Sequence, residues 1–155
     1  MLYKHQWGNR MKLAKCAAVL VATATLVACA TAPANYSVNK SRSYDKGYDQ
    51  VWEDLVSFFA SNNIPIKNIA KDSGVIYAES TRFDDSYADC GKPGIMAVVG
   101  RKANFNVFVN RSGAKPAVSV NTDFTEFRRF DTAQTTVQCN SKGIIEARLL
   151  DSVRQ

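Results

Sequence analysis

The amino-acid sequence predicts an α+β domain in which an antiparallel sheet of about four to six strands is covered on one face by two helices. Three observations favour this fold. An apolar stripe with helical spacing begins at Tyr48, alternating apolar runs flank turn-forming residues, and a second helical stripe lies near the end of the chain. We expect one domain over residues 37–155, because that length is typical of a single globular unit.

The first helix is predicted by apolar residues that recur every three or four positions. They are Tyr48, Val51, Trp52, Leu55, Val56 and Phe59. Asn62, Asn63 and Pro65 follow the stripe and predict its end. We interpret the aromatic members of the stripe as core residues rather than as a platform for a ligand.

Strand-like runs predict two hairpins and one further strand. The first hairpin joins residues 64–69 to residues 75–79 through a turn at Asp72-Ser73-Gly74. The second joins residues 104–110 to residues 118–124, and another strand is expected at residues 135–139. Residues 37–43 are either a linker or a short first strand.

The second helix is expected from about Lys142 to Val153, with Ser141 as its amino-terminal cap. Its predicted inner stripe is apolar and consists of Ile145, Leu149 and Val153, widened by Ile144 and Leu150. The two helices and the sheet would then form two layers around one core.

The amino-terminal segment has the layout of a secretory signal, with Lys12 and Lys15 ahead of an apolar run that ends at Ala28. Residues 16–28 are fewer than the roughly 20 that a membrane-spanning helix needs. Residues 1–10 fit such a signal poorly, so we expect translation to begin at Met11; the alternative is a longer basic leader that gives the same final product. Residues 1–28 are therefore interpreted as a signal peptide.

The end of this segment, Leu26-Val27-Ala28-Cys29, resembles the lipobox of bacterial lipoproteins. The resemblance implies a diacylglyceryl group on the Cys29 thiol and cleavage before that residue. Ala30, rather than Asp, follows the cysteine, which by the same resemblance implies export to the outer membrane with the domain in the periplasm. Residues 29–36 would be the lipidated cysteine and a tether. The alternative is an ordinary secretory leader that happens to contain a cysteine.

Removal of the leader changes the charge and the chemistry of the chain. Of 20 basic residues, Lys4, Arg10, Lys12 and Lys15 lie in the leader, so 16 basic and 14 acidic residues remain. This near balance gives no case for nucleic-acid binding.

The single histidine, His5, also lies in the leader, which excludes Ser-His and Cys-His catalysis in the mature protein. No recognisable catalytic set is present, so we expect no enzyme and no cofactor.

Two cysteines, Cys90 and Cys139, remain after Cys16 is cleaved off and Cys29 is lipidated. In an oxidising compartment such a pair is expected to form a structural disulfide. A redox-active pair or a thiolate metal site is the alternative, but no CxxC spacing supports it.

The stretch from Thr81 to Gly100 is predicted to be a long loop. Its aspartates, Asp84, Asp85 and Asp89, do not match the spacing of a calcium loop, and we expect no metal site. The apolar run from Gly94 to Gly100 is expected to be a buried strand or packed loop. The alternative is an exposed surface for a partner or lipid, formed by Ile95, Met96, Val98 and Val99.

Aromatic and basic residues alternate over residues 124–130. A strand end with solvated arginines is the expected structure. The alternative is that Phe127, Arg128 and Arg129 bind anionic lipid headgroups or another envelope protein.

The order of elements resembles the helix-grip arrangement found in lipoprotein subunits of the outer-membrane β-barrel assembly machinery. This resemblance rests on the element order and on the phrase Ser-Gly-Val-Ile-Tyr-Ala at residues 73–78, and it transfers no functional residues. We expect a non-enzymatic module that binds another envelope component, most simply a protein. A carrier that holds a small ligand or lipid between the sheet and the helices is the second hypothesis, and a histidine-independent enzyme is the third.

Overall fold

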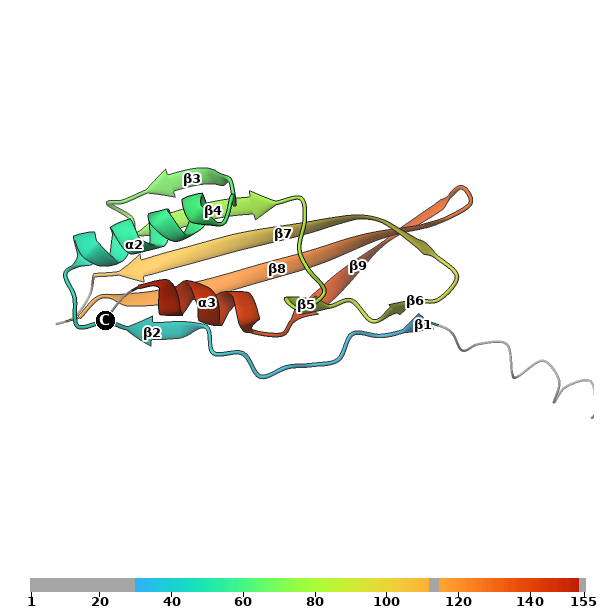
Figure 1. Ribbon diagram of the computed structural model, residues 1–155, viewed down its shortest axis with the longest axis horizontal. Helices are drawn as coiled ribbons and strands as arrows, with labels where there is room; N and C mark the ends of the chain where they lie inside the picture. Colours follow the sequence, from blue (N-terminus) through green and yellow to red (C-terminus); the bar gives the residue numbers. More distant parts are fainter. Residues whose placement is uncertain (1–29, 112–114, 154–155) are drawn as a thin grey trace, which may run out of the picture.

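The computed structural model describes residues 30–111 and 115–153, and it has the predicted α+β architecture. The predicted leader, its expected start at Met11 and the predicted lipidation site at Cys29 lie outside these residues. The elements follow the order β1(Ala30–Thr31), β2(Ser41–Ser43), α2(Tyr48–Ser61), β3(Ile66–Ala70), β4(Val75–Ser80), β5(Ala88–Asp89), β6(Lys92–Pro93), β7(Ala97–Asn110), β8(Ala117–Phe130), β9(Ala133–Ser141) and α3(Ile144–Ser152). Both helices lie over one face of the sheet (Figure 1).

The main sheet is antiparallel and has seven strands. Its order is β3-β4-β7-β8-β9-β5, and β2 pairs with β8. One edge of β8 pairs with β7, and two strands share the other edge. There β2 pairs with residues 117–119 and β9 with residues 124–130. The count exceeds the expected four to six because β2 and β5 are only three and two residues long. Runs this short show no alternation in sequence.

The β7–β8 hairpin is much longer than the sequence pattern predicted. Each strand has 14 residues, which corresponds to about 46 Å. Strand β7 begins at Ala97, so the predicted loop over residues 81–100 is wrong in its last part. Paired residues continue from Asn110↔Ala117 to Ala97↔Arg129, with a bulge between Val98 and Gly100. The sheet therefore extends beyond the helices at one end (Figure 1).

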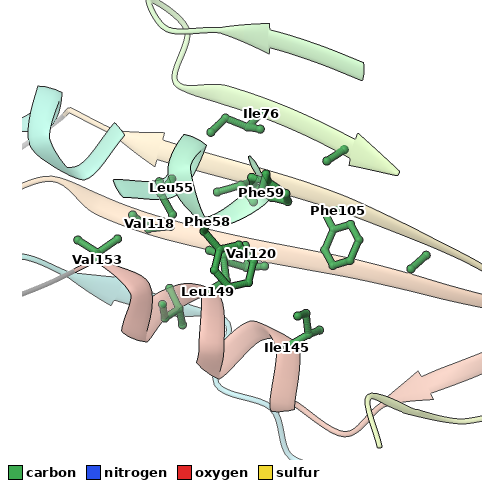
Figure 2. Close-up of a cluster of buried hydrophobic side chains, with 14 of the residues drawn as sticks. Leu55, Phe58, Phe59, Ile76, Phe105, Val118, Val120, Ile145, Leu149 and Val153 are labelled. Atoms are coloured by element: carbon green, nitrogen blue, oxygen red, sulfur yellow. The ribbon is translucent and has the colours of Figure 1, made fainter. Parts of the chain in front are cut away.

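The core lies between the helices and the inner face of the sheet (Figure 2). Leu55 and Phe59 of α2 and Leu149 of α3 are completely buried against Val118 and Val120 of β8. The predicted stripe of α2 is confirmed as a core face, and the helix ends near Asn62 as expected.

Helix α3 is rotated relative to the predicted stripe. Ile145, Leu149 and Val153 are buried as predicted, but Ile144 is 42% exposed and Glu146 is completely buried. The helix also begins two residues later than expected, with Gly143 rather than Ser141 at its N-cap. Gly143 has a φ of 81°. The backbone amide of Gly143 donates a hydrogen bond to the Ser141 hydroxyl (3.0 Å). The left-handed conformation at Gly143 starts the helix after the turn.

The segment expected to be a tether lies against the domain instead. Strand β1 pairs with β6, and Lys92 N donates to Thr31 Oγ1 (3.0 Å). The amide of Ala34 donates to Asp89, while its carbonyl accepts from Asn140 (2.9 Å). Composition alone did not predict these contacts, because their partners are far away in sequence.

In the part of the chain that the structure describes, no helix combines the length and hydrophobicity needed to cross a membrane.

The rotation of α3 can be tested by comparing Leu149→Ala with Ile144→Ala. Loss of the completely buried Leu149 side chain should lower the free energy of unfolding by about 2–5 kcal/mol through lost burial and a residual cavity. The same truncation at the 42%-exposed Ile144 should have a much smaller effect. Urea denaturation followed by circular dichroism measures both, and equal losses would contradict this placement of the helix.

Candidate functional site

All seven residues predicted as a contact surface lie at the extended end of the sheet. They come from the β6–β7 turn, the start of β7 and the end of β8. The register places Val98 opposite Arg128 and Ala97 opposite Arg129. Residues about 30 positions apart in sequence are therefore adjacent, and the structure joins the two predicted halves of the surface.

Four large apolar side chains are exposed here: Ile95 (75%), Phe130 (53%), Val99 (45%) and Val98 (42%). We call these four residues the distal tip. For residues 94–100 the expected strand forms only from Ala97 onward, residues 94–96 are a turn, and the expected burial is wrong. Neither α2 nor α3 covers this part of the sheet (Figure 1), and its apolar side chains are exposed among the described residues. Met96 and Phe127 are partly buried beside them.

Arg128 is buried, not solvated as the sequence predicted. Only 5% of the residue is exposed. Its guanidinium donates to Glu126 Oε1 (2.7 Å) and to the backbone carbonyl of Cys90 (2.5 Å). Longer hydrogen bonds reach the carbonyls of Gly91 and Lys92. Arg128 thus fixes the segment that carries β6, whereas its neighbour Arg129 is exposed as expected.

Glu126 joins two guanidinium groups beneath this surface. Its other carboxylate oxygen accepts from Nε (3.1 Å) and Nη2 (3.0 Å) of Arg101. Arg101 also pairs with Asp85 (2.5 Å) and lies over the ring of Phe83. Glu126 is 2% exposed, so these contacts compensate for the removal of its charge from water.

The predicted disulfide between Cys90 and Cys139 is present. It connects the segment before β6 to β9 across 49 positions of sequence. Both cysteines are buried. The covalent bond and Arg128 therefore hold the same backbone segment from two sides.

Asp89 connects this segment to the beginning of the described chain. Its carboxylate accepts from the amide of Gly91 (2.7 Å), from the amide of Ala34 (3.2 Å) and from the Tyr36 hydroxyl (3.0 Å). These hydrogen bonds, that of Gly91 first, lower the pKa of the Asp89 carboxyl because they favour its charged form. The side chain has a structural role.

The other loop aspartates also have protein partners. Asp84 accepts from the amide of Ser86, and Asp85 pairs with Arg101. Within residues 30–111 and 115–153, no three acidic, cysteine or histidine side chains are grouped in a way that would hold a metal ion.

The structure has two open hollows on its surface. One, of about 370 Å³, lies beside the site and is lined by residues that include Asp85, Asp89, Val98, Arg101, Glu126 and Lys142. The other, of about 410 Å³, lies beside the stretch of β8 between β2 and β9 and is lined by polar residues that include Asn35, Asp123, Gln138 and Asn140. Neither hollow lies within the core between the sheet and the helices.

Sequence reasoning missed Glu126, Arg101 and Phe130. The alternation of β8 contained a usable signal, because Glu126, Arg128 and Phe130 continue the face of Phe124. Charged residues in such a row were interpreted as solvent-facing. Their burial depends on the disulfide-linked segment that covers them, which no local pattern shows.

Comparison of the sequence with models of protein families and with curated proteins finds no match. The site must therefore be interpreted from its own geometry.

Because Glu126 joins Arg101 and Arg128 at this end of the sheet, we expect Glu126→Gln to lower the stability of the fold strongly. Removal of the central charge leaves two guanidinium groups without their shared anion, and we expect a loss of about 3–5 kcal/mol in the free energy of unfolding. Chemical denaturation of the oxidised protein measures the loss.

The matched control is Glu79→Gln, which removes a carboxylate paired with Lys102 (3.3 Å) on the opposite, open face of the sheet. This solvent-screened pair should contribute far less. Equal effects of the two substitutions would contradict the importance assigned to Glu126.

Proposed function

We propose that this chain is an outer-membrane lipoprotein, anchored through Cys29, whose periplasmic domain is a non-enzymatic binding or assembly module for another envelope component. The lipobox at residues 26–29 supports the anchor. The distal tip supports the binding role, because a group of exposed apolar side chains marks an interaction site when it is concentrated in one place. Four of the eight exposed large hydrophobic residues in the described part of the chain belong to it.

The rigidity of the platform beneath the tip supports recognition rather than catalysis. The disulfide and Arg128, which is paired with Glu126, both hold the backbone at Cys90. This position shortly precedes Ile95, the first residue of the distal tip. A surface held in one conformation loses little conformational entropy when it binds. The acids nearby are occupied by cations or backbone amides, which leaves them poorly suited to proton transfer.

A ligand carrier is the alternative function. Such a protein would hold its ligand between the sheet and the helices, where Leu55, Phe59, Phe105 and Leu149 fill the space. The polar hollow beside β8 is the place that a carrier would have to use. This filled interior favours the binding module.

The anchor is tested by replacing Cys29 with Ser in cells supplied with labelled palmitate. The variant should lose lipid labelling and move from the membrane to the soluble fraction, because the acylated thiol is absent. Cys16→Ser is the matched control, since this leader cysteine is expected to be removed on processing. Unchanged membrane association of Cys29→Ser would contradict the anchor.

The binding role is tested by placing a photo-crosslinking amino acid at Val99 in intact cells. Because Val99 belongs to the distal tip, we expect reproducible adducts with an envelope component. The same group at Ile69, which is equally exposed (47%) on β3, is the control. Absence of adducts at Val99, or identical adducts at both positions, would contradict a binding surface at the tip.

A further inference from the structure

The described chain begins beside the distal tip. Ala30 pairs with Pro93, and Thr31 pairs with Lys92. Pro93 is two residues before Ile95, and the amide of Met96 donates back to the Pro93 carbonyl (3.2 Å) in the turn that carries Ile95. In Figure 1, β1, β6 and the β8–β9 turn lie at the same end of the long axis of the molecule.

The pairing of β1 is close enough to leave no room for a side chain at Gly91. A Cβ built there would lie 1.9 Å from the carbonyl oxygen of Thr31, and the φ of Gly91 is +68°. Three residues after Thr31, Asp89 and Asn140 hold the backbone of Ala34. The first residues of the described chain are therefore docked along the domain and supply no free linker.

This docking determines where an anchor on Cys29 would be. Cys29 directly precedes Ala30 in the sequence, and Ala30 is the first residue of β1. Acyl chains on the Cys29 thiol would thus enter the bilayer at the end of the domain where β1 pairs with β6. A domain attached without slack cannot stand clear of the membrane, and the part beside the anchor must be at the lipid surface.

The side chains at this end suit that position. The four residues of the distal tip expose large apolar side chains to solvent. Lys92 and Arg129 are exposed beside them, and Asp131 in the β8–β9 turn is the acidic residue there. Arg128 is neutralised internally by Glu126. Apolar residues next to exposed cations are typical of surfaces that lie in the interface of an anionic bilayer.

We propose that the distal tip is embedded in the membrane interface beside the acyl chains of Cys29, so that the bilayer itself is the envelope component bound at this surface. The proposal rests on the proposed lipid anchor. It replaces the expected protein partner at these residues with lipid. Four apolar side chains alone give weak membrane binding, but the anchor raises their effective concentration at the bilayer.

The test uses the lipidated protein reconstituted into phosphatidylethanolamine–phosphatidylglycerol vesicles whose acyl chains carry bromine. Phe130→Trp places a fluorescent reporter at the tip, and Ile95→Trp is an independent second reporter. Phe108→Trp is the matched control, because Phe108 is similarly exposed (46%) on the open face of the sheet. Native Trp52 is buried in α2 and contributes the same background to each variant.

We expect emission from both tip reporters to shift to shorter wavelength and to be quenched several-fold more strongly than emission from the control. Lipid adducts from a photo-crosslinker at Val99 in cells are the corresponding result in vivo. Quenching at the control level, or adducts with a protein in place of lipid, would overturn the proposal.

Flotation of the same vesicles separates this proposal from the proposed function. Protein that fails to float with the vesicles contradicts the anchor and the function together. Protein that floats while its tip reporters stay unquenched contradicts the embedded tip and leaves the anchor standing.

Discussion

The shape of the distal end depends on the carboxylate of Glu126, which joins Arg101 to Arg128. Beyond α2 and α3 this face of the sheet is covered by the disulfide-linked segment, whose buried Ala88 and Cys90 add only small apolar side chains to the core. The charged groups hold that segment in place: Arg128 binds the carbonyls of residues 90–92, and Arg101 binds Asp85 and the carbonyl of Phe83. A buried charge set of this kind is costly unless all its members are paired. An arrangement of the covering segment that broke these contacts would leave buried charges unpaired.

The disulfide and the ion network have complementary effects on that segment. The bond from Cys90 to Cys139 limits the unfolded chain and ties the segment to β9. It does not determine how residues 91–96 are oriented. The hydrogen bonds of Arg128 supply that orientation, and the Asp89 carboxylate adds the amino-terminal strand to the same unit. Three different interactions thus converge on about seven residues and make a rigid base for the exposed apolar side chains.

The sequence was sufficient for the fold because its core elements have strong periodic patterns. The stripe of α2, both hairpins and the Cys90–Cys139 bond could be predicted, since each depends on local spacing or on a count of cysteines. The rotation of α3 could not, because it depends on how the helix packs against β8, where Thr122 donates to the buried Glu146. The burial of Arg128 was missed for the same physical reason, since a charged residue becomes internal only when a distant segment provides its partners.

The candidate site was predicted in part for a related reason. Apolar composition identified Ile95, Val98 and Val99, but it could not distinguish a buried strand from an exposed one. That difference depends on whether a helix covers the strand, and both helices lie over the other end of the sheet (Figure 1). The segment after Cys29 resembled a linker because small residues and a proline are common in linkers. Its pairing with β6 depends on a strand about 60 residues later.

The loss of the expected linker changes how the molecule would be oriented on a membrane. With a flexible tether, the position of the exposed apolar residues would carry no information about the anchor. With Ala30 paired to Pro93, the described chain begins at the end of the elongated domain that carries the distal tip, and the proposed anchor would be attached there. The helices and the β3–β4 hairpin then lie toward the opposite end, and the open face of the sheet, which bears Asn106, Asn121 and Phe108, stays accessible from the side. A partner protein would meet this domain on that face or at its far end, because lipid would already occupy the tip.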